Sequence, residues 1–133
     1  MPAVHVTLEL ENTTDADCAD FPSSTVVRRA SVRALVDPAE VLLGLPRDIA
    51  ECLGLRVRDA EGVSHAKGRE CRGPVTVRAV NRTGIFECLI APAGTEPVLG
   101  RIPLRRLDLL VDPVQRQLVV RPESPIYPLY SVK

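Results

Sequence analysis

The chain has 133 residues, of which 45% are apolar and only 3% aromatic, and its seventeen basic and seventeen acidic residues cancel to a formal charge of zero. This length predicts a single domain, residues 1–133, with a core built from Val, Leu, Ile and Ala. A nucleic-acid partner is not expected, since phosphate recognition needs a local excess of Lys and Arg.

The N-terminal segment MPAVHVTLEL has neither the basic flank nor the long apolar core of a signal peptide. No apolar run approaches the roughly 18 residues of a membrane span. We therefore expect a soluble cytoplasmic protein without a membrane partner. The four cysteines never occur as CxxC and the two histidines are isolated, which predicts no metal site and no other cofactor. Cys52 and Cys88, in AECLGL and FECLI, are predicted to be small buried core residues.

The first third of the chain predicts two strands and a loop. Residues 3–10 alternate apolar and polar side chains, which is typical of a strand. Residues 11–24 are polar and turn-rich and predict a flexible loop. Residues 25–36 predict a long strand that places Asp37 at its end, because Pro38 lacks the backbone N–H that a strand needs.

Two short helices are predicted. The first is PRDIAECLGL, with Pro46 at its first position and Gly54 after its last turn. The second lies in IPLRRLDLL, residues 102–110. Each follows an apolar strand and a turn, and this shared plan agrees with an internal duplication or with a chance similarity of two strand–helix units.

The middle of the chain predicts two β-hairpins. Their arms are residues 55–59 with 64–71 and residues 74–80 with 84–90. The first hairpin turns at Ala60, Glu61 and Gly62, and the second at residues 81–84.

After the hairpins come a short strand at Val98-Leu99-Gly100, a turn at residues 111–113 and a strand at 117–121. The tail, residues 122–133, is extended and carries Pro between apolar residues. Many short strands with one or two short helices predict an all-β domain.

The order and spacing of these pieces resemble the retropepsin-like (clan AA) aspartic peptidases, of the small bacterial single-domain type. The segments that carry the resemblance are Leu35–Glu40, Leu45-Pro46, Leu53-Gly54-Leu55, Val98-Leu99-Gly100 and Leu109–Pro113. The resemblance implies a retropepsin-like β-barrel with a flap hairpin that works as a two-fold homodimer. Each subunit would supply one catalytic aspartate, here Asp37.

The resemblance also implies roles for other segments. Ala60, Glu61 and Gly62 would lie in the flap and close over an extended peptide substrate or ligand. Val98, Leu99 and Gly100 would form the apolar-Gly motif of the second half. The C-terminal residues 122–133 would form a strand of the dimer interface.

The triplet at the catalytic position departs from the Asp-Thr/Ser-Gly of the family. Here Asp37 is followed by Pro38, Ala39 and Glu40. Pro38 has neither the hydroxyl that braces the two loops nor an N–H, and Ala39 adds a methyl group where Gly allows close approach. Glu40 adds a second acid beside the axis, which would raise the cost of ionising Asp37 if both were buried together.

These changes predict a weak or inactive homologue that acts as a dimeric peptide-binding or assembly module. The alternative is an active endopeptidase in which Asp37 from each subunit activates water. A heterodimer with an intact Asp-Thr-Gly partner also fits the altered triplet. Without the resemblance, Asp37-Pro38 would be a structural turn like Asp112-Pro113, in a small β-barrel interaction domain with no cleft.

Overall fold

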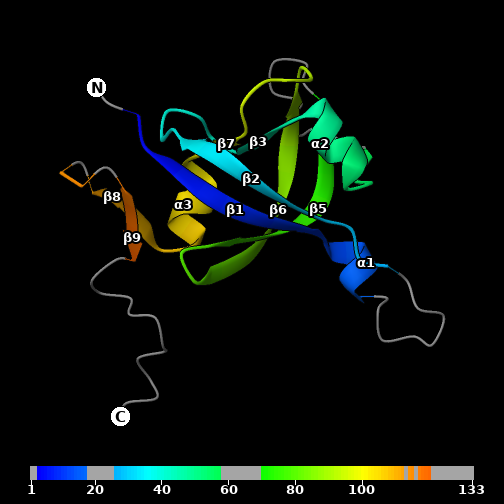
Figure 1. The fold of residues 1–133 in the computed structure, drawn as a ribbon, viewed down its shortest axis with the longest axis horizontal. Coiled ribbons are helices and arrows are strands. Elements are labelled where there is room, and N and C mark those ends of the chain that lie inside the picture. The colour runs from blue at the N-terminus through cyan, green and yellow to red at the C-terminus, as the bar shows by residue number, and fades with distance from the viewer. Residues whose placement is uncertain (1–2, 18–25, 58–69, 113, 116, 121–133) are drawn as a thin grey trace, which may run out of the picture.

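The computed structural model describes residues 3–17, 26–57, 70–112, 114–115 and 117–120, drawn in colour in Figure 1. Short strands dominate this part of the chain. The elements are β1 (His5–Asn12), α1 (Thr13–Asp17), β2 (Arg29–Val36), β3 (Leu43–Pro46), α2 (Arg47–Cys52), β4 (Arg56–Val57), β5 (Cys71–Ala79), β6 (Arg82–Ala91), β7 (Val98–Leu99), α3 (Arg101–Arg106), β8 (Leu109–Asp112) and β9 (Gln117–Val120).

Six strands close into a barrel. Their order is β1-β2-β7-β3-β6-β5, and β5 pairs back onto β1 through the register Leu10↔Val77. Strand β4 extends the sheet beside β5, and β8 with β9 forms a separate two-stranded sheet. Figure 1 shows β8 and β9 at one end of the molecule and α1 and α2 at the other. The predicted all-β barrel is confirmed.

The barrel interior is aliphatic, as the composition predicts. Every second residue of β5 from Cys71 to Ala79 is buried, because alternate side chains of a strand point to opposite faces. Leu8, Leu43 and Leu99 are fully buried on three different strands. None of the helices in the described ranges is long and apolar enough to cross a membrane.

The segment predicted as a polar loop, 11–24, is partly regular. Glu11 belongs to β1, and Thr13–Asp17 form one turn of helix. The buried Asn12 begins this helix, since its side-chain oxygen accepts the N–H of Asp15 at 2.9 Å. The remaining residues, 18–24, lie outside the described ranges, as does the tail 122–133.

Three other local predictions need correction. Leu43–Pro46 form a strand, so Pro46 ends β3 and precedes α2 instead of occupying its first position. The hairpin of β5 and β6 turns at Val80 and Asn81, which both have positive φ and make a two-residue turn. The turn predicted at 111–113 begins inside a strand, because β8 continues to Asp112.

The two halves of the barrel repeat one local structure. Helix α2 is followed by Leu53, then Gly54 with φ of 66°, and helix α3 by Leu107, then Asp108 with φ of 56°. Leu53 N–H donates to a carbonyl four residues earlier at 3.0 Å, and Leu107 N–H does the same at 2.9 Å. The internal similarity of the sequence therefore has a structural counterpart in these two matching helix ends.

Candidate functional site: the Asp37 turn

Asp37 stands at the end of β2 and heads a tight turn. Its N–H donates to the Leu99 carbonyl at 3.1 Å, and its own carbonyl accepts the Glu40 N–H at 3.0 Å. The Asp37 side chain closes the turn, because Oδ1 accepts the Ala39 N–H at 3.0 Å. Ala39 thus provides the backbone donor at this position although it is not a glycine. The result is a half-buried carboxylate in a fixed orientation.

The next three residues, Pro38, Ala39 and Glu40, are exposed on the outer side of the turn. Pro38 can donate no hydrogen bond there, and its carbonyl accepts one from Arg101 Nη1 at 3.4 Å. The turn therefore presents carbonyl oxygens, a methyl group and carboxylates, and no hydroxyl.

The segment Val98-Leu99-Gly100 lies directly beside this turn. Strand β7 runs parallel to β2, with Leu99 opposite Val36. A Cβ atom at Gly100 would lie 2.3 Å from the Leu42 carbonyl oxygen and 2.9 Å from that of Glu40. Only a glycine allows the two segments to approach so closely. Asp37 and the apolar-Gly motif are thus brought together by the fold.

The first residues of α3 bind the same turn segment through their backbone N–H groups. Arg101 N–H donates to the Glu40 carbonyl at 2.8 Å, and Ile102 N–H donates to the Val41 carbonyl at 2.9 Å. The first N–H groups of a helix have no partner within the helix, so the turn satisfies them. The loop and the helix are therefore one unit.

The two arginines that could neutralise Asp37 bind elsewhere. Arg47 donates to the Glu70 carboxylate at 3.3 Å, and Arg101 contacts Pro38. Within the described ranges, no ion pair joins Asp37 to either of them. Its carboxylate can thus face a ligand or a second carboxyl group.

The predicted flap residues Ala60, Glu61 and Gly62 lie outside the described residues. The two strands on either side of them, β4 and β5, are described, and Val57 of β4 pairs with Arg72 of β5 in an antiparallel register. This pairing is what the arms of a hairpin require.

The sequence did not single out two residues that lie close to the Asp37 turn. Gly44 and Glu96 line a pocket of about 100 Å³ together with Glu40 of the turn. The signal for Gly44 was a glycine within the apolar run LLGLP. Glu96 carries no signal of its own, because it lies in the connection between β6 and β7.

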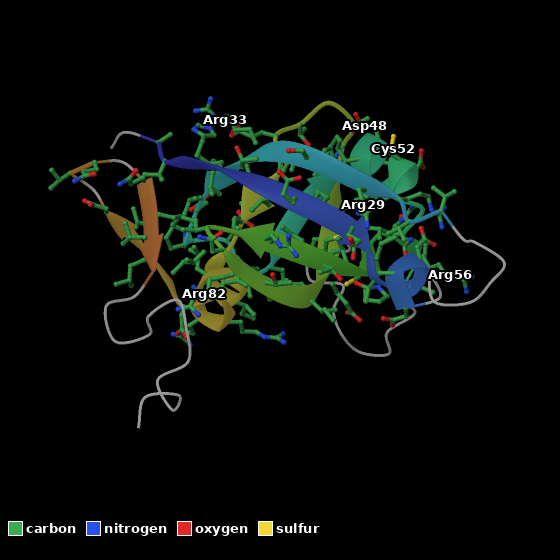
Figure 2. The ribbon with its side chains drawn as sticks, turned by 60° about the horizontal axis from the view of Figure 1, so that its bottom comes forward. Arg29, Arg33, Asp48, Cys52, Arg56 and Arg82 are labelled. Atoms are coloured by element: carbon green, nitrogen blue, oxygen red, sulfur yellow. The ribbon has the colours of Figure 1, made fainter. Side chains whose placement is uncertain are left out.

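The cysteines that the structure describes are not part of the turn. Cys88 is buried in the core, and burial is the main reason why the pKa of its thiol is raised to about 12. The prediction that Cys52 is buried is wrong: it is exposed on α2, and Figure 2 shows it near Asp48 on this helix. The helix turns its Ala50 face to the barrel instead. No group of three possible metal ligands occurs among the described residues.

A scan against protein-family models and a search of curated proteins found no match to this chain. Among solved structures, the retroviral protease-like domain of Ddi1 from Leishmania major is similar, with a TM-score of 0.54 and 16% identity over 90% of this chain and 89% of that one. EIAV protease complexed with an inhibitor has a TM-score of 0.47 and 18% identity, over 80% and 86% of the two chains. A retropepsin-like aspartic protease from Rickettsia conorii has a TM-score of 0.42 and 11% identity, over 85% and 90%. The first similarity identifies the fold as retropepsin-like.

Proposed function

We propose that two copies of this retropepsin-like chain form a two-fold homodimer in which the Asp37 turns face each other and bind an extended peptide, with weak or no hydrolysis. The observation that carries this proposal is the turn itself. Gly100 packs closely against it, the first N–H groups of α3 donate to its carbonyl groups, and residues 38–40 are exposed. Next to it, Val41 and Ile102 expose 43% and 37% of their surface, as residues of an interface would in a separate chain.

The residues after Asp37 explain why hydrolysis would be weak. In a pair of aspartates on a two-fold axis, one carboxylate is the base toward water and the other is the acid toward the peptide carbonyl. Both must be held in place by their loops. Pro38 offers neither an N–H nor a hydroxyl for a bond across the axis, and Glu40 brings a further negative charge. A peptide could still bind by strand addition, covered by Ala60, Glu61 and Gly62.

A second function, an active aspartic endopeptidase, is favoured by one observation. The Asp37 carboxylate accepts a hydrogen bond from the Ala39 N–H, and among the described residues no arginine forms an ion pair with it. The acid is therefore still oriented by its own turn. Two such groups that share one proton could activate water despite the altered neighbours.

The experiment that separates these functions uses three forms of the purified protein. They are the natural chain, Asp37→Asn, and a rebuilt variant with Pro38→Thr and Ala39→Gly. Each is incubated with a diverse peptide library at mildly acidic and neutral pH, and cleavage is read by mass spectrometry. We expect the natural chain to retain peptides without cutting them and the rebuilt variant to gain cleavage. Cleavage by the natural chain that Asp37→Asn abolishes would establish the active alternative instead.

The cellular location belongs to the same proposal. Two cysteines that the structure describes, Cys52 and Cys88, are free thiols. A reducing compartment keeps cysteines in this state. We therefore place the protein in the cytoplasm.

A further inference from the structure

The pocket beside the Asp37 turn, lined in part by Glu40, Gly44 and Glu96, has a composition that selects for one kind of ligand group. Polar and apolar groups contribute about equally to its walls, and the apolar part includes Leu42 and Val98. Glu40 follows Asp37 in the turn, and Gly44 of β3 pairs with Val98 of β7. The pocket therefore adjoins the Asp37 turn through Glu40.

The volume of about 100 Å³ limits what can enter. A closed cavity of about 150 Å³ binds benzene, so a pocket of this smaller volume suits a slender side chain better than an aromatic ring. An unbranched aliphatic chain fits this volume. Apolar walls favour its methylene groups, as they do for the stems of Lys and Arg.

The charges in the pocket are of one sign. Glu40 and Glu96 contribute carboxylates, and among the described residues no basic side chain lines it. Two neighbouring side chains have partners of their own: Arg101 contacts the Pro38 carbonyl, and His5 Nε2 lies 3.1 Å from Glu96 Oε1. A cationic head group would therefore meet acceptors without competition from a lysine or arginine of the lining.

Gly44 keeps the pocket open. A Cβ atom at this position would lie 3.6 Å from the Val98 Cβ, which is an ordinary contact and requires no shift of the backbone. An alanine would thus occupy part of the pocket without disturbing the strands. This gives a way to fill the pocket without changing its charge.

We propose that this pocket receives a Lys or Arg side chain of the bound peptide. The methylene groups would lie against Leu42 and Val98, and the cationic group would face Glu40 and Glu96. This inference rests on the proposed peptide binding at Asp37 and adds the side-chain class that the site prefers. It also explains what Glu40 does in a turn where it has no evident use for hydrolysis.

The first test measures which peptides of a random library are retained by the natural chain and by four folded variants. We expect Lys and Arg to be enriched at one peptide position, and the enrichment to fall about three- to tenfold in Glu40→Gln, Glu96→Gln and Gly44→Ala. Glu51→Gln, which removes an exposed carboxylate of α2 outside the pocket, should leave the enrichment unchanged. Retention without any preference for Lys or Arg would overturn the inference and leave the proposed function intact.

A second measurement does not depend on peptide binding. The protein is titrated with N-acetyl-lysine methylamide and with the norleucine derivative, which has a similar chain and no charge, and amide chemical shifts are recorded. We expect the lysine derivative alone to shift Gly44 and Val98, and Glu40→Gln to weaken this response. If no library peptide binds and this result holds, the proposed function fails and the pocket assignment stands. Equal responses to both derivatives, or none, would overturn the assignment.

Discussion

Gly100 is the residue on which the geometry of the Asp37 turn most depends. Two carbonyl groups of the turn segment, those of Glu40 and Leu42, lie within 2.9 Å and 2.3 Å of the position that a Cβ atom would take. Backbone atoms on that side cannot move away easily, because the Glu40 carbonyl also accepts the Arg101 N–H. Any side chain at this position must push the turn away from α3 and lose that hydrogen bond.

We predict that Gly100→Ala lowers the free energy of unfolding by about 2–4 kcal/mol, because it combines a backbone clash with lost hydrogen bonds. Gly44→Ala is the matched control, since its Cβ would make an ordinary contact at 3.6 Å. We expect that control to stay within about 1 kcal/mol of the natural chain. Urea denaturation monitored by circular dichroism measures both. Equal stability of the two variants would contradict the described approach of Gly100 to the turn.

At the scale of elements, a polar cluster joins α1 to the barrel. Arg28 donates to the nearly buried Asp15 carboxylate through Nε at 2.7 Å and Nη2 at 2.9 Å, and its backbone N–H also donates to Asp15. Asn12 Nδ2 reaches across to the Leu53 carbonyl at 2.8 Å, at the end of α2. The N-terminal strand, α1 and α2 are thus held together by a few charged and amide groups.

Two carboxyl groups, Asp15 of this cluster and Glu70 just before β5, predict how the stability depends on pH. Hydrogen bonds from Arg28 hold the pKa of Asp15 below its usual value, and Arg72, helped by Arg47, does the same for Glu70. A carboxyl group whose pKa is lower in the folded than in the unfolded state stabilises the protein above its unfolded pKa. That contribution is lost as the pH falls through the folded pKa.

We therefore expect the free energy of unfolding to decrease as the pH is lowered from about 5 to about 2. Asp15→Asn should make this decrease shallower, since it removes one of the two groups. Asp17→Asn, at the exposed end of the same helix, should leave the slope unchanged. Urea denaturation at a series of pH values gives the slopes. The same slope in the natural chain and in Asp15→Asn would show that Asp15 makes no such contribution.

The elements that the sequence predicted well are those whose burial follows a simple period. Residues 3–10 and 74–90 alternate, and they form strands of the barrel. The short strand Leu43–Pro46 could not be recognised, because its burial does not alternate strictly, it pairs in parallel with β6 and its sequence resembles a turn before a helix. Helix α1 depends on the partners of Asp15 and Asn12, which are distant in the sequence.

In the candidate site, too, some residues could be predicted from the sequence and others could not. Asp37 and Gly100 were predicted as site residues from the family resemblance, and the structure brings their two segments together through β2 and β7. The pocket with Gly44 and Glu96 could not, since it is assembled from β3, β6, β7 and the connections β2–β3 and β6–β7, which only the closed barrel brings together.

At the scale of the whole molecule, the proposed function requires that the exposed Asp37 turn meets the same turn of a second copy. In a two-fold interface each residue on the axis lies close to its own counterpart. Residues 38–40 are exposed at that turn. A pair of cysteines introduced there would fall within the Cα separation of about 4.4–6.8 Å that a disulfide requires, whereas cysteines elsewhere on the surface would not.

The measurement that tests this most directly is disulfide trapping in a Cys18→Ser, Cys52→Ser background, with Ala39→Cys or Glu40→Cys added one at a time. Mild oxidation followed by non-reducing electrophoresis reads out covalent dimers, and sedimentation of the unmodified chain gives its mass in solution. Ala93→Cys, exposed in the connection after β6, is the control. We predict a dimer in solution, and a covalent dimer when the cysteine is at position 39 or 40 but not when it is at 93. A monomer that is trapped at neither position would contradict this prediction.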